Sequence, residues 1–206
     1  NKTLETLAHV WQALSQQVAT RHALLVNLGG GMVTDLCGFA AATFKRGIAY
    51  INLPTTLLAM VDASVGGKTG INFNGLKNEI GAFAPANCVL LETEFLRSLD
   101  AHNFFSCYAA MLKHGLISTP RHLDELLAFD TEQPDYALLK DMVGRSVQVK
   151  EDIVEQDPKE HGIRKALNLG HTIGHAFESL ALAEDRPVLH GYAVAWGLVC
   201  ELYLSH

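Results

Sequence analysis

The sequence predicts a chain in two parts, an α/β part built on a parallel sheet followed by an all-helical part. Short apolar runs alternate with stretches of helical periodicity up to about residue 98, a pattern typical of parallel strands connected by helices. Beyond that residue only helical periodicity remains. We therefore place an α/β domain at residues 1–98 and a helical domain at residues 99–206.

The first part opens with a predicted helix over residues 3–19, for which Thr3 is a suitable N-cap. Buried strands are predicted at residues 23–28, 48–53 and 88–92. Three glycines and a helix follow the first strand, which indicates a Rossmann-like sheet. Such a sheet normally opens with a strand, whereas this chain opens on a helix and stops inside another. We therefore expect one or more strands to be missing and both domains to be incomplete.

The second part contains five stretches with helical periodicity and no predicted strand. The helices are expected at roughly 100–118, 121–129, 135–155, 166–182 and 188–205. A polar stretch, DPKEHGIR, interrupts them and is predicted to be a loop.

The composition argues against several classes of protein. Apolar residues make up 49% of the chain and the formal net charge is −6, which argues against a nucleic-acid binder. No apolar run approaches the ~18 residues of a membrane span. Four scattered cysteines indicate buried thiols in a reducing compartment, so we expect a cytoplasmic protein.

The glycine turn at residues 29–31 is the first candidate binding site. Glycines between a strand and a helix let the backbone approach a ligand, and the N–H groups at a helix start favour phosphate. Asp35 lies one turn into the helix. The spacing departs from G-x-G-x-x-G, and a tight turn beside a solvated aspartate is the alternative interpretation.

The segment that follows residue 54 is the second candidate site. Its polar residues, set among glycines, are Thr55, Thr56, Asp62, Lys68, Lys77 and Asn78. A P-loop is excluded, because Asp62 occupies the position of its first glycine. Lysines in such a loop suit a phosphate or a polyhydroxylated substrate, and a polar surface loop is the alternative.

Three histidines near the end of the chain form the third candidate site. His171 and His175 are four residues apart on one helix face, and His190 begins the next helix. Such imidazoles can share a metal ion, although hydrogen-bonded histidines would show the same spacing. An anionic ligand is expected from the helix at residues 109–117, which offers only Lys113 and His114.

Six motifs are distributed along the chain between residues 29 and 197: GGGMVTDLCGFAAATFKRG, LPTTLLAMVDASVGGKTGIN, LKNEIGAF, AMLKHGLI, LNLGHTIGHAFE and LHGYAVAWG. Together they resemble the 3-dehydroquinate synthase family of the sugar-phosphate cyclases. The resemblance implies an NAD- and metal-dependent lyase of the shikimate pathway, with zinc or cobalt. Its substrate would be a phosphorylated sugar acid, 3-deoxy-D-arabino-heptulosonate 7-phosphate. Transient oxidation by NAD, phosphate elimination, reduction and aldol closure would give 3-dehydroquinate, and a homodimer is expected.

The resemblance also assigns roles to residues. It implies cofactor contacts at Lys2, Gly30, Gly31, Met32, Val33, Thr34, Asp35, Thr55, Thr56, Lys68, Lys77, Phe95, Leu96, Arg97 and Ser98. It implies substrate contacts at Arg46, Asp62, Lys68, Asn78, Lys113, Lys150, Arg164 and Asn168. Catalytic roles would belong to Lys68, Asn78, Lys113, Arg164, Asn168 and His175, and the metal ligands would be His171 and His190.

One position departs from the family pattern. Family members carry a glutamate metal ligand where this chain has Ala110, and usually a glycine where it has Cys107. Loss of a charged ligand is expected to weaken zinc binding. An inactive fragment or pseudoenzyme is therefore one alternative, and another sugar-phosphate cyclase is a second. A metal-dependent alcohol or glycerol-phosphate dehydrogenase is a third, which the SVGGKTGIN segment disfavours.

Overall fold

The computed structural model describes residues 2–205 and divides into two compact units, Asn1–Glu92 and Thr93–His206. The sequence placed the change of pattern after residue 98. In the structure the short 3-10 segment η3 (Thr93–Ser98) packs in the second unit, against α5 (Tyr136–Gln156). Among the described residues, no helix is both long enough and apolar enough to cross a membrane.

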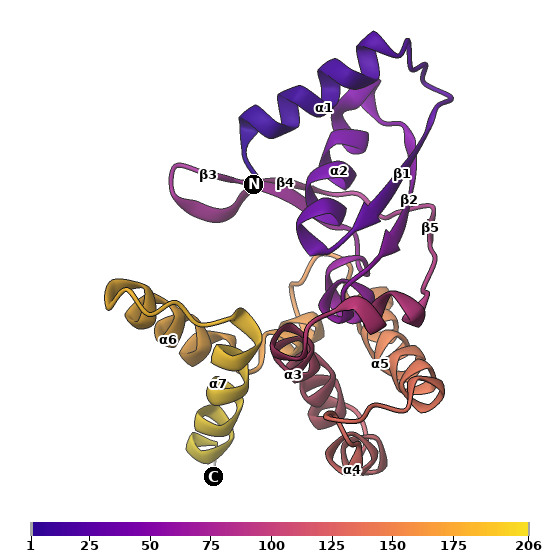
Figure 1. The fold of residues 1–206 in the computed structure, drawn as a ribbon. Coiled ribbons are helices and arrows are strands. Elements are labelled where there is room, and N and C mark those ends of the chain that lie inside the picture. The colour runs from indigo at the N-terminus through magenta and orange to yellow at the C-terminus, as the bar shows by residue number, and fades with distance from the viewer. Residues whose placement is uncertain (1, 206) are drawn as a thin grey trace. The chain divides into compact units, whose positions relative to one another are not determined.

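The first unit is built on a three-stranded parallel sheet with the order β1-β2-β5 (Figure 1). Its strands are β1 (Leu24–Gly29), β2 (Ala49–Pro54) and the short β5 (Cys88–Val89). Its helical segments are α1 (Leu4–Gln16), α2 (Gly31–Thr43) and the 3-10 turn η1 (Phe44–Arg46). Thr3 caps α1 by accepting from the Thr6 N–H at 3.2 Å. The predicted α/β architecture of this part is confirmed.

One face of this sheet is covered and the other is exposed. Helix α2 packs on β1 and β2, and its apolar side chains join the core of the unit. The core comprises Leu7, Leu36, Phe39, Ala40 and Ile71, with Trp11 packed against it. Alternate residues of β1 point the other way, because side chains of a strand alternate between its faces. Leu24, Val26 and Leu28 are accordingly more than half exposed.

The segment after residue 66 is an antiparallel hairpin, and our expectation of a loop there was wrong. Strands β3 (Lys68–Phe73) and β4 (Leu76–Phe83) pair along most of their length, after a π-helical segment η2 (Ala59–Ala63). Asn74 and Gly75 form the turn with φ of +48° and +81°. Asn-Gly is the strongest short-range sequence indication of a hairpin, so the turn was visible in the sequence.

The second unit is all helical, as predicted. Its helices are α3 (Ala101–Ile117), α4 (Pro120–Ala128), α5, α6 (His171–Ala183) and α7 (His190–Leu204), with the 3-10 segment η4 (Ile163–Asn168) before α6. The single helix expected over residues 166–182 is instead two segments. Gly170 separates them with φ of +81°, a left-handed conformation that ends η4 and redirects the chain into α6.

The cysteines differ from the expectation of buried thiols. All four are free, Cys88 is exposed, and Cys37, Cys107 and Cys200 are partly exposed. Free thiols agree with the absence of a disulfide framework in the sequence, but burial of these side chains was a wrong prediction.

Replacing Gly197 by alanine is expected to destabilise the helical unit by about 2–3 kcal/mol. A Cβ there would lie 2.0 Å from the Gly170 carbonyl oxygen, so α6 and α7 would have to separate. Gly144→Ala is the matched control, because no atom lies within 4 Å of its added Cβ on α5. Alanine there should stabilise by about 0.5–1 kcal/mol. Urea unfolding followed by circular dichroism measures both, and equal stability of the two variants would contradict this packing.

Candidate functional site

The glycine turn of the first unit lies where β1 ends and α2 begins. Gly30 is the N-cap of α2, and no side chain caps the helix there. The Thr55 N–H donates to the Gly29 carbonyl at 3.0 Å, which ties the ends of β1 and β2 together. A Cβ on Gly30 would lie 3.2 Å from Thr56 Cγ2, so glycine permits this close approach. Three predicted cofactor residues thus meet at the carboxyl edge of the sheet, where α/β proteins bind nucleotides.

Asp35 is at the centre of a small polar cluster beside this turn. Lys2 Nζ donates to Asp35 Oδ2 at 2.7 Å and also to Asn78 Oδ1. Burial raises the pKa of Tyr50 to about 12, and the charge of Asp35 adds to this shift. The structure therefore brings Lys2 and Asp35, predicted for the cofactor, next to Asn78, predicted for the substrate.

The side chains directly after the turn differ in what they present to a ligand. Thr34 is buried, and its hydroxyl donates to the Gly31 carbonyl at 3.0 Å. Val33 packs on the turn, since a Cβ on Gly29 would lie 2.6 Å from Val33 Cγ2. Met32 is 47% exposed. Of these three predicted cofactor residues, Met32 has the most accessible side chain.

Further predicted residues of this unit lie on η1, on the hairpin and on η2. Arg46 follows the far end of α2, about 20 Å from the glycines at 1.5 Å per residue. Lys68 begins β3 at the open end of the hairpin, whereas Lys77 and Asn78 lie near its turn. Asp62 is half-buried in η2. Arg46 and Lys68, which are predicted to hold phosphate, therefore come from different elements of this unit.

The predicted cofactor residues Phe95 to Ser98 belong to the second unit, on η3. Leu96 is buried in the core of that unit. Arg97 Nε donates to Glu94 Oε2 at 2.6 Å, and its guanidinium lies 4.2 Å from the centre of the Tyr136 ring. The ion pair lowers the pKa of Glu94 and raises that of Arg97.

Three cations predicted to bind substrate are buried inside the helical unit. Lys113, Lys150 and Arg164 are 2%, 6% and 1% exposed. They come from α3, α5 and η4, and each of these elements packs on the other two. Positive charges that are removed from water favour anions nearby. Buried cations of this kind are suited to pair with a phosphate or a carboxylate.

The loop before η4 holds Arg164 in place. The Arg164 Nη1 donates to the Pro158 carbonyl at 2.6 Å, and its backbone N–H donates to Asp157 Oδ2 at 3.1 Å. Burial by itself would raise the pKa of Asp157, but backbone N–H groups, including that of Gly162, donate to it and lower it overall. Asn168, at the end of η4, donates to Glu160 Oε1 at 2.7 Å.

The three late histidines form a triangle of imidazole rings. The ring centroids of His171, His175 and His190 lie 5.3–5.7 Å apart. Imidazoles that share a tetrahedral zinc ion have centroids roughly 5 Å apart, given Zn–N distances of about 2.0–2.1 Å. His171 Nδ1 lies 3.3 Å from the Leu169 carbonyl oxygen. Donation to that oxygen would leave Nε2 as the metal-binding nitrogen.

Glu178 completes this cluster, and the sequence analysis missed it. Its Oε2 lies 3.1 Å from His190 Nδ1 and 3.9 Å from His175 Nε2. Ligand atoms of His175, Glu178 and His190 all lie within 4.8 Å of one another. Positions 171, 175 and 178 fall within about 60° on a helical wheel, so the spacing could have revealed it. Imidazoles with a carboxylate are a donor set that zinc favours, and the residues therefore fit the metal.

The start of α6 is positioned by α7. Glu201 on α7 accepts from the Gly170 N–H at 2.6 Å and from the Ile173 N–H at 3.1 Å. This carboxylate satisfies N–H groups at the beginning of α6, where the helix dipole favours negative charge. Because α6 begins at His171, the contact fixes where the imidazole cluster is built. Glu201 is a second residue that the sequence analysis missed, since the contact joins positions 31 residues apart.

Position 110, where the resemblance predicts a glutamate ligand, lies on the face of α3 that packs against α7. Ser106 Oγ accepts from the Gly191 N–H at 3.1 Å, directly after His190. Ala110 lies one turn further along α3 on the same face and is buried. Its methyl group offers no ligand atom. Cys107 is partly exposed on α3.

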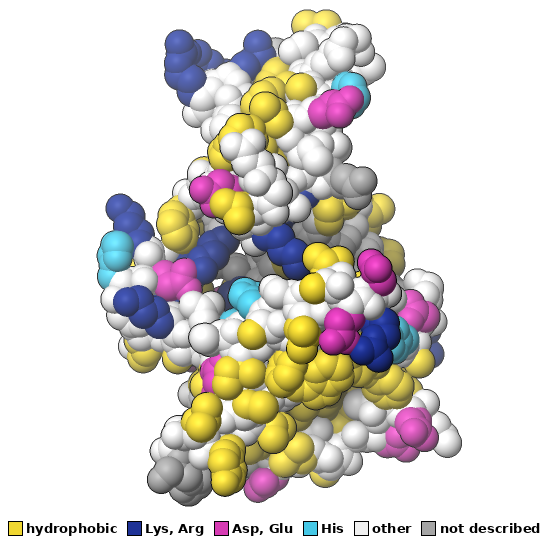
Figure 2. Space-filling model, turned by 90° about the vertical axis from the view of Figure 1, so that its left-hand side faces the viewer, with side chains coloured by type: hydrophobic (Ala, Val, Ile, Leu, Met, Phe, Trp, Pro, Cys, Tyr) yellow, Lys and Arg dark blue, Asp and Glu magenta, His cyan; other side chains and the backbone are white. Residues whose placement is uncertain are grey.

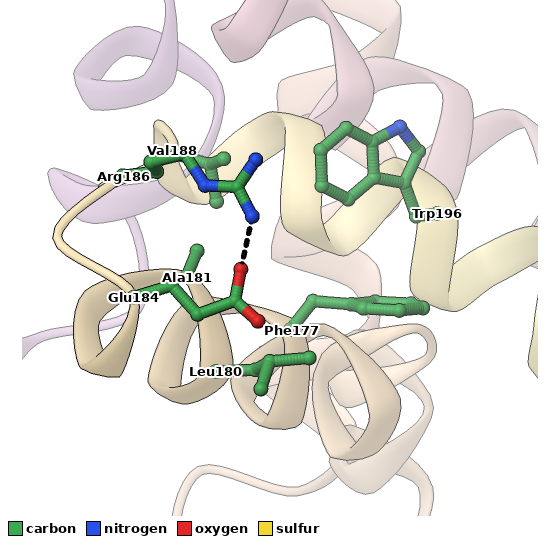
Figure 3. A pocket seen from close by; sticks show the side chains of 7 residues that line it. All are labelled: Phe177, Leu180, Ala181, Glu184, Arg186, Val188 and Trp196. Carbon is green, nitrogen blue, oxygen red and sulfur yellow. Dashed lines mark hydrogen bonds and ion pairs between the residues drawn. The ribbon is translucent and has the colours of Figure 1, made fainter.

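A shallow apolar groove of about 250 Å³ lies between α6 and α7 (Figure 3). It is lined by Phe177, Leu180, Ala181, Glu184, Arg186, Val188 and Trp196. Its two charged residues, Glu184 and Arg186, pair with each other. Figure 2 shows hydrophobic side chains gathered on this part of the helical unit. The groove lies on the face of α6 opposite the histidines and is separate from the polar cluster.

Comparison with known proteins agrees with these features. Residues 1–106 match the family description "3-dehydroquinate synthase N-terminal" and residues 107–206 match "3-dehydroquinate synthase C-terminal". The 3-dehydroquinate synthase of Parabacteroides distasonis is 63% identical over the whole chain, which covers 58% of that relative.

Two similar solved structures are cyclases. The 2-epi-5-epi-valiolone synthase of Streptomyces hygroscopicus, with NAD+ and Zn2+ bound, is 32% identical with a TM-score of 0.83, over 95% of this chain and 55% of that one. A 2-deoxy-scyllo-inosose synthase complexed with carbaglucose-6-phosphate, NAD+ and Co2+ is 28% identical with a TM-score of 0.87, over 96% and 55% of the two chains.

The fold and these similarities thus place the chain in the sugar-phosphate cyclase class. Within this class, both family descriptions match, and together they cover every residue. The chain belongs to the 3-dehydroquinate synthase family. It spans just over half the length of the curated relatives that it matches.

Ala110→Glu is expected to raise the zinc affinity of this chain by about ten- to hundredfold, the range seen for groups that support metal ligands. The added carboxylate would lie on the α3 face that packs beside His190. Competition with a chromophoric chelator measures the affinity.

Ala110→Gln is the matched control, because it adds similar volume without an anionic ligand. Equal affinities of the glutamate and glutamine variants would show that position 110 does not face the metal. Circular dichroism verifies that both variants fold.

Proposed function

We propose that this chain provides the dinucleotide site, the metal site and much of the substrate site of a 3-dehydroquinate synthase. The reaction would convert 3-deoxy-D-arabino-heptulosonate 7-phosphate to 3-dehydroquinate and phosphate. The observation that carries the proposal is the 63% identity to a 3-dehydroquinate synthase over the whole chain. The buried cations and the imidazole cluster of the helical unit support it.

The cofactor would be NAD, bound at the glycine turn. Gly30, Gly31 and the start of α2 would face the pyrophosphate, since helix N-termini favour phosphate groups. Thr55 and Thr56 border the same edge of the sheet. When bound, NAD accepts and returns a hydride, and the divalent metal polarises the alcohol that is oxidised.

The chain's own residues would bind and orient the substrate. Lys113, Lys150 and Arg164 would hold its phosphate and carboxylate, because buried cations pair strongly with anions. His171 and His190 would hold zinc or cobalt. In this arrangement His175 is exposed enough to exchange a proton with a group leaving the substrate.

A second candidate is another sugar-phosphate cyclase. The similarity to the valiolone and inosose synthases favours it, because those structures share most of the fold of this chain. Their identities of 32% and 28% are about half of the 63% to the dehydroquinate synthase. Buried Arg164 beside Asn168 also suits a substrate with a carboxylate.

The remaining alternative is a protein that binds ligands without turnover, which Ala110 favours. We further propose a cytoplasmic homodimer that binds neither nucleic acid nor membrane. The net charge of −6 supports the exclusion of nucleic acid.

Phosphate release distinguishes these functions. With NAD and zinc present, the Ala110→Glu variant should release phosphate from the heptulosonate phosphate faster than the parent chain does. Release should require both NAD and zinc. Release from a sugar phosphate that lacks a carboxylate, and not from the heptulosonate phosphate, would identify another cyclase. Binding of the heptulosonate phosphate without release by either protein would identify a non-catalytic chain.

Lys68→Ala is expected to weaken binding of the heptulosonate phosphate by about tenfold or more, since a hydrogen bond to a charged group contributes about 1.5–3 kcal/mol. Lys68 is exposed at the start of β3, so the fold should be unaffected. Isothermal titration calorimetry measures the affinity. Lys140→Ala, on the exposed face of α5, is the control, and the same affinity in both variants would remove Lys68 from the substrate site.

A further inference from the structure

We propose that Glu178 is the anionic metal ligand of this chain and takes the place of the carboxylate that α3 does not provide. The juxtaposition that carries this inference is the Glu178 carboxylate between the imidazoles of His175 and His190. The inference deepens the proposed function, because it concerns the metal site on which that function rests.

The helices that form the cluster have few acidic residues to offer. Helix α3 contains no aspartate or glutamate. Helix α7 contains Glu201, which is engaged at the start of α6 by two backbone N–H groups. Glu178 is the acidic residue of α6. Within α3, α6 and α7 it is therefore the carboxylate best placed for a metal.

The environment of Glu178 is that of a ligand. Its side chain is 15% exposed, whereas that of Glu184, the residue that follows α6, is 47% exposed. A carboxylate that is largely removed from water is stabilised by positive charge. A divalent cation bound by the neighbouring imidazoles would add positive charge and would gain an anionic ligand.

The distances are close to those of a metal site. Glu178 Oε2 lies 3.1 Å from His190 Nδ1 and 3.9 Å from His175 Nε2. Ligand atoms around a tetrahedral zinc ion lie roughly 3.3 Å apart, given metal–ligand distances of about 2.0–2.1 Å. Small side-chain movements would therefore place Glu178 Oε2 and a nitrogen of His190 around one ion, with His171 next to them.

The competing role for Glu178 is that of an orienting partner. In that role its carboxylate accepts a hydrogen bond from His190 Nδ1 and leaves Nε2 for the metal, as is common around metal-bound histidines. The two roles make different predictions when a carboxylate is supplied at position 110. A ligand can be replaced by another ligand, whereas a residue that orients His190 is still required.

A double-mutant cycle separates the two roles. Zinc affinity is measured by chelator competition for the parent chain, Glu178→Gln, Ala110→Glu and the double variant. Glutamine keeps the size and can still accept from His190, but it removes the charge. We expect Glu178→Gln to weaken zinc binding by about a hundredfold in the parent chain and by less than about threefold in the Ala110→Glu background. Glu184→Gln, which lies outside the cluster, should leave the affinity unchanged.

Three results would overturn the proposal. They are an equal loss in both backgrounds, no loss in the parent background, and a parent chain that does not bind zinc. X-ray absorption of the zinc-loaded parent chain provides a second measurement that does not depend on Ala110→Glu. The zinc absorption spectrum of the parent should differ from that of Glu178→Gln, because a charged carboxylate ligand is lost, and identical spectra would also overturn the proposal. None of these measurements needs NAD or substrate. They therefore test the role of Glu178 even if the chain does not catalyse the proposed reaction.

Discussion

The close approach of α6 and α7 is the constraint on which the helical unit's site depends. Added Cβ atoms at Gly174 and Gly197 would lie 2.9 Å and 2.0 Å from backbone oxygens of the opposing segment. The helices therefore pack backbone to backbone, which larger residues would prevent. Glu201 adds a polar tie across the same interface. With both contacts in place, histidines from two helices reach a common centre.

The candidate metal ligands and the buried cations of the helical unit lie on different elements. The imidazoles and Glu178 face one another along α6 and α7. The buried cations come from α3, α5 and η4, which pack on each other. In the proposed function, a metal and an anionic substrate group would each meet a complementary set of side chains. The apolar groove lined by Phe177 and Trp196 lies on a different face of α6 and contributes to neither set.

In the first unit, backbone pairing between strands brings the candidate binding residues together. Parallel pairing of β1 with β2 aligns their carboxyl ends, so the glycine turn and the residues after Pro54 have to be neighbours. Lys2 and Asn78 lie far apart in sequence, yet both reach the Asp35 cluster because α1 and the hairpin pack beside α2. Residues predicted separately for cofactor and substrate therefore share one cluster.

The local sequence determined where most helices and strands form, and tertiary packing decided which residues contact one another. The helix after the glycines, the parallel strands, the N-cap at Thr3 and the start of α7 at His190 all follow from periodicity and capping, which depend on neighbouring residues. The Asn74-Gly75 hairpin was readable in the same way but was overlooked. The contacts of Glu201 with α6, of Gly191 with Ser106 and of Glu178 with His190 required the folded chain. They join residues on different helices, and no local rule specifies which helix faces which.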